Sequence, residues 1–218
     1  MSSAADAGVR LPLISALAPD PRRPSSVRLE IDGVRFGSVP REVVAKEGLE
    51  VGRPVDPDLR QRLIAAGDVE AAIRTLLRAL ERRSYARSDL GRRLLRKGHP
   101  RAAVDAALEN AAGLGLLNDA VFARDYVQSR AARGRGPSRL TRDLLAMGVD
   151  RVDIERALAA EWPEGKDQGD VPLALATKRA EQLGRLPRPV KRRRVLAYLA
   201  RRGFTGREVT EMVGRVVG

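Results

Sequence analysis

Three glycines share the same pattern of apolar neighbours, and this repeat constrains the fold more than any other feature of the sequence. The glycines are Gly98, Gly148 and Gly203. Four apolar columns agree in all three copies: Leu90, Leu140 and Val195 eight residues before the glycine, Leu94, Leu144 and Leu199 four before, Val104, Ile154 and Val209 six after, and Leu108, Leu158 and Val213 ten after. Residues four apart share one helix face, and glycine often ends a helix in a left-handed conformation. Each copy therefore predicts two short helices that meet at its glycine.

A third helix is predicted at the front of each copy. Apolar residues with helical spacing lie there in the first two copies: Ile73, Leu76, Leu77 and Leu80, then Val121, Phe122, Tyr126 and Val127. The last copy begins with the segment 172–184. Glycine spacings of 50 and 55 residues fit three-helix units in series. The sequence predicts three-helix repeats at residues 69–114, 115–162 and 171–218, with a linker at 163–170.

The segment before the repeats predicts a small β-hairpin. Residues 27–39 hold two alternating apolar and polar runs joined by Asp32-Gly33, a pair that favours a tight type I′ turn. Two short helices should follow, the second capped by Asp56 and ending near Gly67, so that the unit covers 27–68. Residues 1–26, rich in Pro, Ser and Ala, are expected to form a disordered tail. The predicted fold is mainly all-α, with a small N-terminal hairpin.

Residues that could carry catalysis are scarce. The chain has no cysteine and one histidine, His99, which directly follows a predicted helix end. Acidic residues are scattered, mostly in predicted first turns of helices, where they complement the helix dipole. The composition thus argues against an enzyme and predicts no cofactor and no metal site. The apolar run at 11–18 is too short to cross a bilayer, so we expect a cytoplasmic protein without a membrane partner.

Positive charge is concentrated in the repeats. The net charge is +13, yet residues 1–69 hold equal numbers of Lys+Arg and Asp+Glu, so all the excess lies beyond them. A biased amino-acid composition alone does not explain a neutral first third. A polyanion-binding region in the repeats explains why the excess positive charge is confined to them.

The excess forms three clusters of basic residues. These are Arg92, Arg93, Arg96 and Lys97 in the first repeat, Arg124, Arg130, Arg133, Arg135 and Arg139 in the second, and Lys191, Arg192, Arg193, Arg194, Arg201 and Arg202 in the third. Guanidinium groups bind phosphate or carboxylate in a bidentate manner. Arg135 and Arg139 flank Pro137, where a new helix should begin, so free helix amides would add to an anion site. The alternative for each cluster is an ordinary solvated helix face with ion pairs.

The middle repeat resembles a known family. The segment LGLLNDAVFARDYVQSRAARGRGPSRLTRDLLAMGV is similar to the second repeat of the regulatory protein RecX family, and ERRSYARSDLGRRLLRKGH and RRRVLAYLARRGF resemble its other repeats. The resemblance covers about residues 27–218. It implies three tandem three-helix repeats in an elongated, curved array. The chain departs from the family pattern at Met147, where a basic residue is common, and at Asn118-Asp119, where two acids are frequent.

The resemblance also implies a function in DNA repair and the SOS response. RecX proteins bind the RecA recombinase filament on DNA and inhibit strand exchange, ATP hydrolysis and co-protease activity. The expected partners are RecA and single- or double-stranded DNA without sequence specificity, and the expected state is a monomer. Two alternatives stay open: a DNA-binding module of helix-turn-helix type that acts without RecA, and a helical scaffold for another protein. The wide distribution of the cations argues against base-specific readout by one helix.

Overall fold

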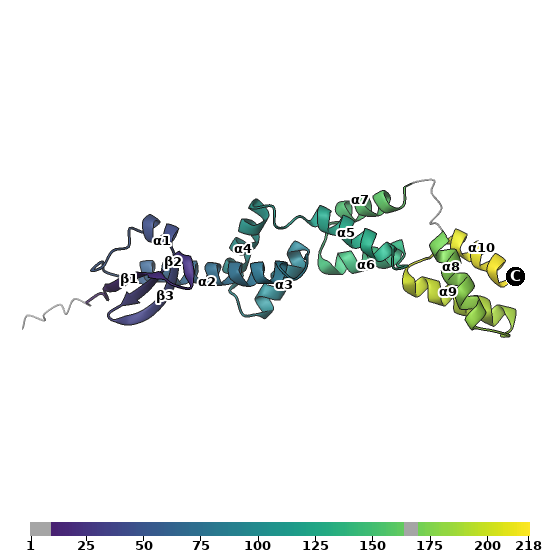
Figure 1. The fold of residues 1–218 in the computed structure, drawn as a ribbon, viewed down its shortest axis with the longest axis horizontal. Coiled ribbons are helices and arrows are strands. Elements are labelled where there is room, and N and C mark those ends of the chain that lie inside the picture. Colours follow the sequence, from purple (N-terminus) through teal and green to yellow (C-terminus); the bar gives the residue numbers. More distant parts are fainter. Residues whose placement is uncertain (1–9, 164–169) are drawn as a thin grey trace, which may run out of the picture. The chain divides into compact units, whose positions relative to one another are not determined.

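The computed structural model describes residues 10–163 and 170–218, which are mostly helical and form two compact units. The first unit consists of two stretches of the chain, the residues up to Arg83 and Gly91–Leu114. The second consists of Ser84–Leu90 and Gly115–Gly218. The boundary between the units falls within one helix, α3. The elements, drawn in Figure 1, are β1 (Ile14–Asp20), β2 (Arg23–Ile31), β3 (Val34–Pro40), α1 (Arg41–Lys46), α2 (Pro57–Leu80), α3 (Arg87–Arg96), α4 (Arg101–Gly113), α5 (Asp119–Ala131), α6 (Pro137–Met147), α7 (Arg151–Glu161), α8 (Asp170–Gln182), α9 (Arg188–Arg202) and α10 (Arg207–Val217).

The first unit begins with a three-stranded antiparallel sheet of order β1-β2-β3. The predicted hairpin is confirmed as β2 and β3, with Asp32 and Gly33 both at positive φ (48° and 76°), as a type I′ turn requires. One face of the sheet packs on α2. Its core residues include Ile14, Leu29, Leu59 and Leu63.

The expectation of a disordered tail is wrong for residues 14–26. These residues form β1 and the start of β2, with Leu17 opposite Leu29. The physical reason is burial, because Ile14 lies only 1% exposed in the core between the sheet and α2. A sheet of two strands is only marginally stable, so the addition of β1 as a third strand stabilises it. Residues 1–9 of the expected tail lie outside the described residues.

Helix α2 covers two helices that were predicted separately: the second short helix after the hairpin and the leading helix of the first repeat. Asp56 caps its start, as predicted, by accepting a hydrogen bond from the Leu59 amide at 2.7 Å. The helix then runs without a break through Gly67, where an end was expected. A glycine inside a helix costs only about 1 kcal/mol, and packing on both sides offsets this cost: Leu59 and Leu63 lie in the sheet core, while Ala72 and Leu76 are buried further along, where α2 packs on α4. The predicted boundary at residues 68 and 69 therefore lies within α2.

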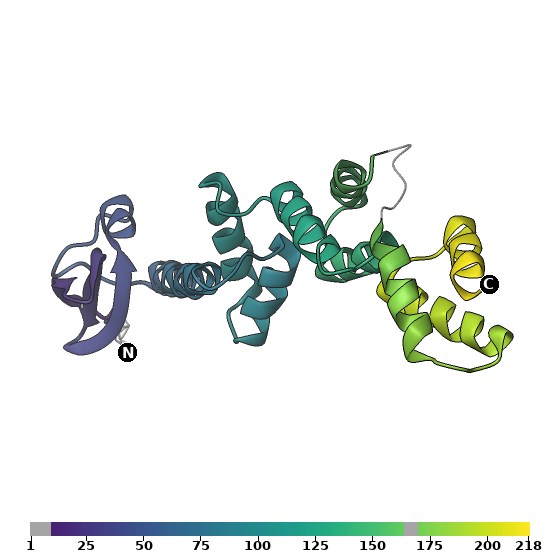
Figure 2. The same ribbon diagram turned by 45° about the vertical axis from the view of Figure 1, so that its right-hand side comes forward.

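The glycine repeat is confirmed in geometry and burial. Gly98, Gly148 and Gly203 all have positive φ (85°, 82° and 96°) at the ends of α3, α6 and α9. The apolar columns before them are buried in all three copies. In the second unit, α5 packs on α7, and α8 packs on both α9 and α10 (Figures 1 and 2).

The second unit contains a close backbone contact between its two repeats. The Gly136 amide donates to the Arg202 carbonyl at 2.8 Å, and the Ser138 amide donates to the Gly203 carbonyl at 3.2 Å. The start of α6 therefore meets the end of α9. A Cβ atom on Gly136 would lie 2.6 Å from backbone atoms of Gly203, and one on Gly203 would lie 2.4 Å from the Arg139 nitrogen. Both positions require glycine for this approach.

This contact predicts unequal effects of two similar substitutions. Gly98 and Gly203 end corresponding helices at similar φ, but a Cβ on Gly98 would have nothing within 4 Å. We expect Gly98→Ala to cost about 1–2 kcal/mol from left-handed strain alone. Gly203→Ala should cost at least about twice as much, because the two backbones must also separate. The comparison is made by urea unfolding, followed by circular dichroism.

The fluorescence of Trp162, the sole tryptophan, reports on the same contact. Its side chain packs on the second-repeat core and shares a small hollow with Phe204 of the third repeat. Gly203→Ala should shift its emission, whereas Gly98→Ala should not. Equal destabilisation by the two variants, with unchanged emission in both, would contradict a requirement for the close contact.

Candidate functional site

Six arginine side chains surround one hollow of about 460 Å³ in the second unit. We call this site the arginine basin. Its residues are Arg130 at the end of α5, Arg133 and Arg135 in the following loop, Arg139 in α6, and Arg201 and Arg202 at the end of α9. The structure thus joins most of the second predicted cluster to the C-terminal part of the third.

The backbone contact between Gly136 and Gly203 positions these arginines. Arg135 directly precedes Gly136, and Arg202 directly precedes Gly203, so the hydrogen bond between Gly136 and Arg202 brings the two segments together. Gly134, at a φ of 73°, reverses the chain after α5. A second polar contact, 3.1 Å between the hydroxyls of Ser138 and Thr205, supports the same junction.

Asp143 holds one side of the basin in place. Its carboxylate lies 2.9 Å from Arg139 Nε and 3.3 Å from Arg135 Nη1. The Tyr126 hydroxyl donates to it at 3.4 Å. Burial raises the pKa of Tyr126, followed in importance by the negative charge of Asp143, so the phenol remains a protonated donor at neutral pH. One carboxylate therefore orders two arginines.

Two other arginines are fixed by aromatic rings and carbonyl groups. Arg202 Nη1 donates to the Gly134 carbonyl at 3.2 Å, and its guanidinium lies 5.0 Å from the centre of the Tyr198 ring. Arg130 lies 5.4 Å from the centre of the Tyr126 ring. Such cation–π contacts add roughly 0.5–1 kcal/mol each at exposed sites. Arg133 and Arg201 are exposed, and within residues 10–163 and 170–218 neither has an ion-pair partner.

The expected anion site at the α6 amides is wrong. The Gly136 and Ser138 amides donate to carbonyls of the third repeat, and the Arg139 amide donates to the Gly136 carbonyl. Because the fold already uses these donors, an anion in the basin would be held by guanidinium groups alone. Sequence spacing could not reveal that the amides of Gly136 and Ser138 have the distant carbonyls of Arg202 and Gly203 as partners.

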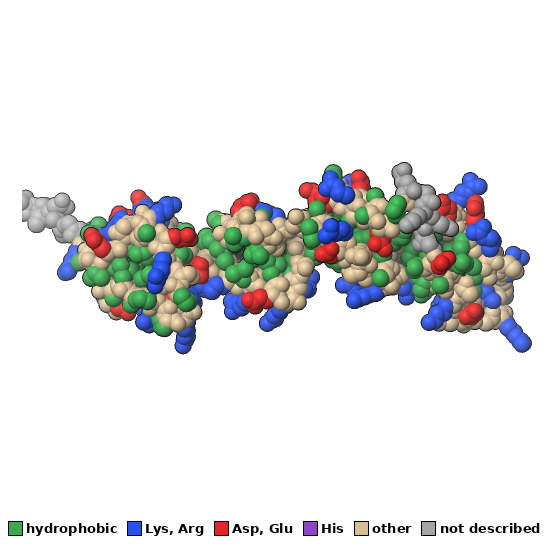
Figure 3. Space-filling view, turned by 45° about the horizontal axis from the view of Figure 1, so that its top comes forward, with side chains coloured by type: hydrophobic (Ala, Val, Ile, Leu, Met, Phe, Trp, Pro, Cys, Tyr) green, Lys and Arg blue, Asp and Glu red, His purple; other side chains and the backbone are tan. Residues whose placement is uncertain are grey.

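The other predicted site residues lie outside the basin. Arg124 pairs with Asp125 at 3.6 Å and borders a separate, mainly apolar hollow between α5 and α7. Arg92, Arg93, Arg96 and Lys97 belong to the first unit, on the last turns of α3 and just after it. Figure 3 shows Lys and Arg side chains spread over the surfaces of both units on the face in view, with acidic groups between them.

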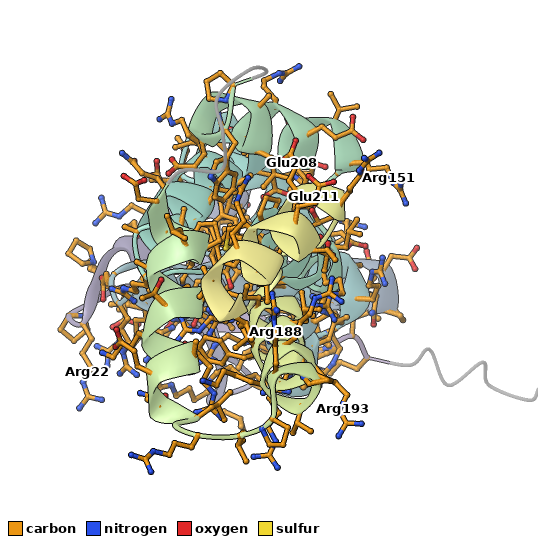
Figure 4. The ribbon with its side chains drawn as sticks, turned by 90° about the vertical axis from the view of Figure 1, so that its right-hand side faces the viewer. Arg22, Arg151, Arg188, Arg193, Glu208 and Glu211 are labelled. Atoms are coloured by element: carbon orange, nitrogen blue, oxygen red, sulfur yellow. The ribbon has the colours of Figure 1, made fainter. Side chains whose placement is uncertain are left out.

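The cluster at Lys191–Arg194 lies near the start of α9, whereas Arg201 and Arg202 lie at its end. The rise of an α-helix places Arg193 roughly 12 Å from Arg201 along the axis. Figure 4 shows Arg193 pointing outward from α9, while Glu208 and Glu211 project from the neighbouring α10. These cations form a second basic surface on the same helix.

Both departures from the family pattern leave local structure intact. Asn118 caps α5 by accepting from the Val121 amide at 3.0 Å. Asp119 accepts a hydrogen bond from the Arg87 amide at 2.8 Å. Met147 packs partly buried against the core of the second repeat. Neither position contributes to the basin.

Two other kinds of site, a cluster of metal ligands and a membrane-spanning helix, are not found among the described residues. No group of three His, Asp or Glu side chains there could hold a metal ion. His99 lies 3.0 Å from the Thr75 hydroxyl, a structural contact. No helix in the described ranges has the length and apolar character needed to cross a membrane.

Comparison with known proteins identifies close relatives. Residues 118–158 match a family model described as RecX, second three-helix domain. The regulatory protein RecX of Mycobacterium ulcerans is 38% identical over 146 residues, which cover 66% of this chain and 83% of that protein. The RecX of Chromohalobacter salexigens is 38% identical over 134 residues, covering 61% of this chain and 84% of the relative.

Two solved structures share the fold. A crystal structure of regulatory protein RecX covers 94% of this chain and all of its own chain, with a TM-score of 0.77 and 24% identity. That of RecX from Lactobacillus salivarius covers 69% of this chain and 96% of its own, with a TM-score of 0.59 and 19% identity. At this identity the likeness concerns the fold.

The geometry predicts that Asp143→Asn strengthens anion binding. The change removes a negative charge from the basin, and this electrostatic gain should exceed the cost of loosening Arg135 and Arg139. One unit charge at about 6 Å in a partly exposed site changes binding by roughly 1 kcal/mol, or about fivefold. The variant should elute from a heparin column at higher salt than the wild-type protein.

Asp153→Asn is the matched control. Asp153 pairs with Arg156 at 3.4 Å on α7, outside the basin, so this variant changes net charge equally. It should elute close to wild type. Identical shifts in the two variants would mean that only total charge matters and that Asp143 has no special place in anion binding.

Proposed function

Because the chain belongs to the RecX family of regulatory proteins, we propose that it binds the RecA recombinase filament on DNA and inhibits strand exchange, ATP hydrolysis and co-protease activity. The arginine basin is the observation that carries this proposal. It lies largely in the repeat that the family model matches, and six guanidinium groups converge there. The protein would act as a non-enzymatic modulator of DNA repair and the SOS response.

The partner would present the groups that guanidinium recognises. A nucleoprotein filament exposes DNA phosphates and protein carboxylates, and arginine binds both with paired hydrogen bonds. Phosphate contacts are independent of base sequence, which fits a regulator that must act wherever a filament forms. The basin contains no Asn or Gln to read base edges.

The other basic clusters would extend the contact. Arg92, Arg93, Arg96 and Lys97, together with Lys191–Arg194, provide cations on both units. An exposed ion pair contributes only about 0.2–1 kcal/mol, so useful affinity needs many of them on one chain. We therefore propose these residues, and Arg124, as auxiliary contacts. A filament partner also implies action in the cytoplasm, and serial repeats that cover one another's apolar faces fit a monomer.

The test is RecA ATPase on single-stranded DNA, titrated with wild-type protein and with the Arg133→Ala/Arg201→Ala double variant. These two side chains are exposed and unpaired within the described chain, so their removal should leave the fold unchanged. We expect wild type to inhibit, and we expect the variant to need about tenfold more protein for the same inhibition because two phosphate contacts are lost. The salt dependence should also weaken: for each lost contact, the slope of log affinity against log salt becomes less steep by about 0.7–0.9.

The control removes two exposed arginines outside the basin, Arg151 in α7 and Arg215 in α10. This Arg151→Ala/Arg215→Ala variant has the same net charge and should inhibit like wild type. Absence of inhibition by wild type at stoichiometric excess would overturn the proposal. DNA binding retained in that case would favour the helix-turn-helix module that acts without RecA.

A further inference from the structure

We propose that the arginine basin is also a binding site for a compact chain of phosphates, such as the triphosphate of a free nucleotide, recognised without regard to the base. Binding itself needs no RecA. One consequence, competition between free triphosphate and the filament, rests on the proposed function. The same phosphate chemistry could be supplied by a nucleic-acid backbone, so the test includes both sources.

The size of the basin suits a small ligand. Its volume of about 460 Å³ falls within the range of roughly 300–1,000 Å³ that small-molecule sites occupy. The two other hollows described in the second unit are smaller, about 160 and 110 Å³, and are lined largely by apolar side chains. Of these three hollows, the basin is the one that suits a highly charged small ligand.

The positive charge of the basin favours an anion that carries several negative charges in a small volume. Six guanidinium groups and the Asp143 carboxylate leave five positive charges around one hollow. In a triphosphate, the terminal phosphate carries roughly −2 and each inner phosphate roughly −1. A fully extended acidic peptide spaces successive residues by about 3.3–3.6 Å, so its carboxylates are less densely packed than the charges of a phosphate chain. A phosphate chain matches the basin better than carboxylates do.

The basin is ordered before any ligand arrives. Asp143 holds Arg135 and Arg139, Gly134 and Tyr198 hold Arg202, and Tyr126 holds Arg130. A free arginine side chain loses roughly 2 kcal/mol of conformational entropy when it is fixed, so tethering in advance favours binding. Only Arg133 and Arg201 must become ordered around the ligand.

The lining contains no aromatic ring or amide side chain that could bind a base, and its guanidinium groups would be used by the phosphates. All six lining residues are arginines. The nearby rings of Tyr126 and Tyr198 are approached by Arg130 and Arg202, and the Tyr126 hydroxyl is directed to Asp143. The amides at the start of α6 are bonded to carbonyls, so the site also differs from a glycine-rich phosphate loop. Affinity should therefore follow the number of phosphates and ignore the base.

The experiment is isothermal titration calorimetry of the full chain at low salt without divalent cations. Inorganic triphosphate, ATP and GTP should bind within about threefold of one another, and AMP at least about 100-fold more weakly. Arg133→Ala/Arg201→Ala should weaken triphosphate binding about tenfold or more, while Arg151→Ala/Arg215→Ala should not. ATP binding much tighter than inorganic triphosphate, equal binding by both double variants, or no binding would overturn the inference.

A second arm separates the two sources of phosphate. Inorganic triphosphate should displace a fluorescent oligonucleotide from the wild-type protein, with a midpoint near the calorimetric dissociation constant. Failure to displace the oligonucleotide would contradict competition between triphosphate and nucleic acid for the basin. Triphosphate binding without any RecA inhibition would support the phosphate site and contradict the proposed function. RecA inhibition without triphosphate binding would support the proposed function and contradict the phosphate site.

Discussion

The hydrogen bonds between the start of α6 and the end of α9 determine how the second unit is built. Helix ends leave backbone donors and acceptors without partners inside the helix. Here the Gly136 and Ser138 amides at one end use the Arg202 and Gly203 carbonyls at the other. Glycine at positions 136 and 203 allows this approach, since a Cβ atom would collide with backbone. The contact joins two repeats and sets six arginines around one hollow.

Gathering like charges carries an electrostatic cost, which the fold offsets with partners of different kinds. Asp143 neutralises part of the charge of Arg135 and Arg139, the Tyr126 and Tyr198 rings face Arg130 and Arg202, and the Gly134 carbonyl accepts from Arg202. These partners order the side chains while leaving Arg133 and Arg201 exposed. The resulting surface presents dense positive charge, which fits a regulator whose proposed target is a repeating polyanion.

Local patterns predicted most of the fold, because helix faces, caps and tight turns depend on neighbouring residues. The glycine columns, the Asp32-Gly33 turn and the Asp56 cap are examples. Strand β1 and the continuity of α2 were missed because both depend on packing against distant residues such as Leu29. The six basin arginines were predicted, but in two separate clusters, since only the backbone contact at Gly203 unites them. Asp143 did leave a signal: it is the sole acid between Asp125 and Asp150, four residues after Arg139.

The length of chain between the two sides of the basin affects when the site can exist during protein synthesis. Gly203 follows Gly136 by 67 positions, the separation also found between Ser138 and Thr205. At roughly 5–20 residues per second, the ribosome needs about 3–13 seconds to synthesise that stretch. Until then α6 lacks its carbonyl partners, and Arg201 and Arg202 have not been made. A nascent chain that has not yet reached Gly203 therefore lacks the basin, even where its earlier segments have folded.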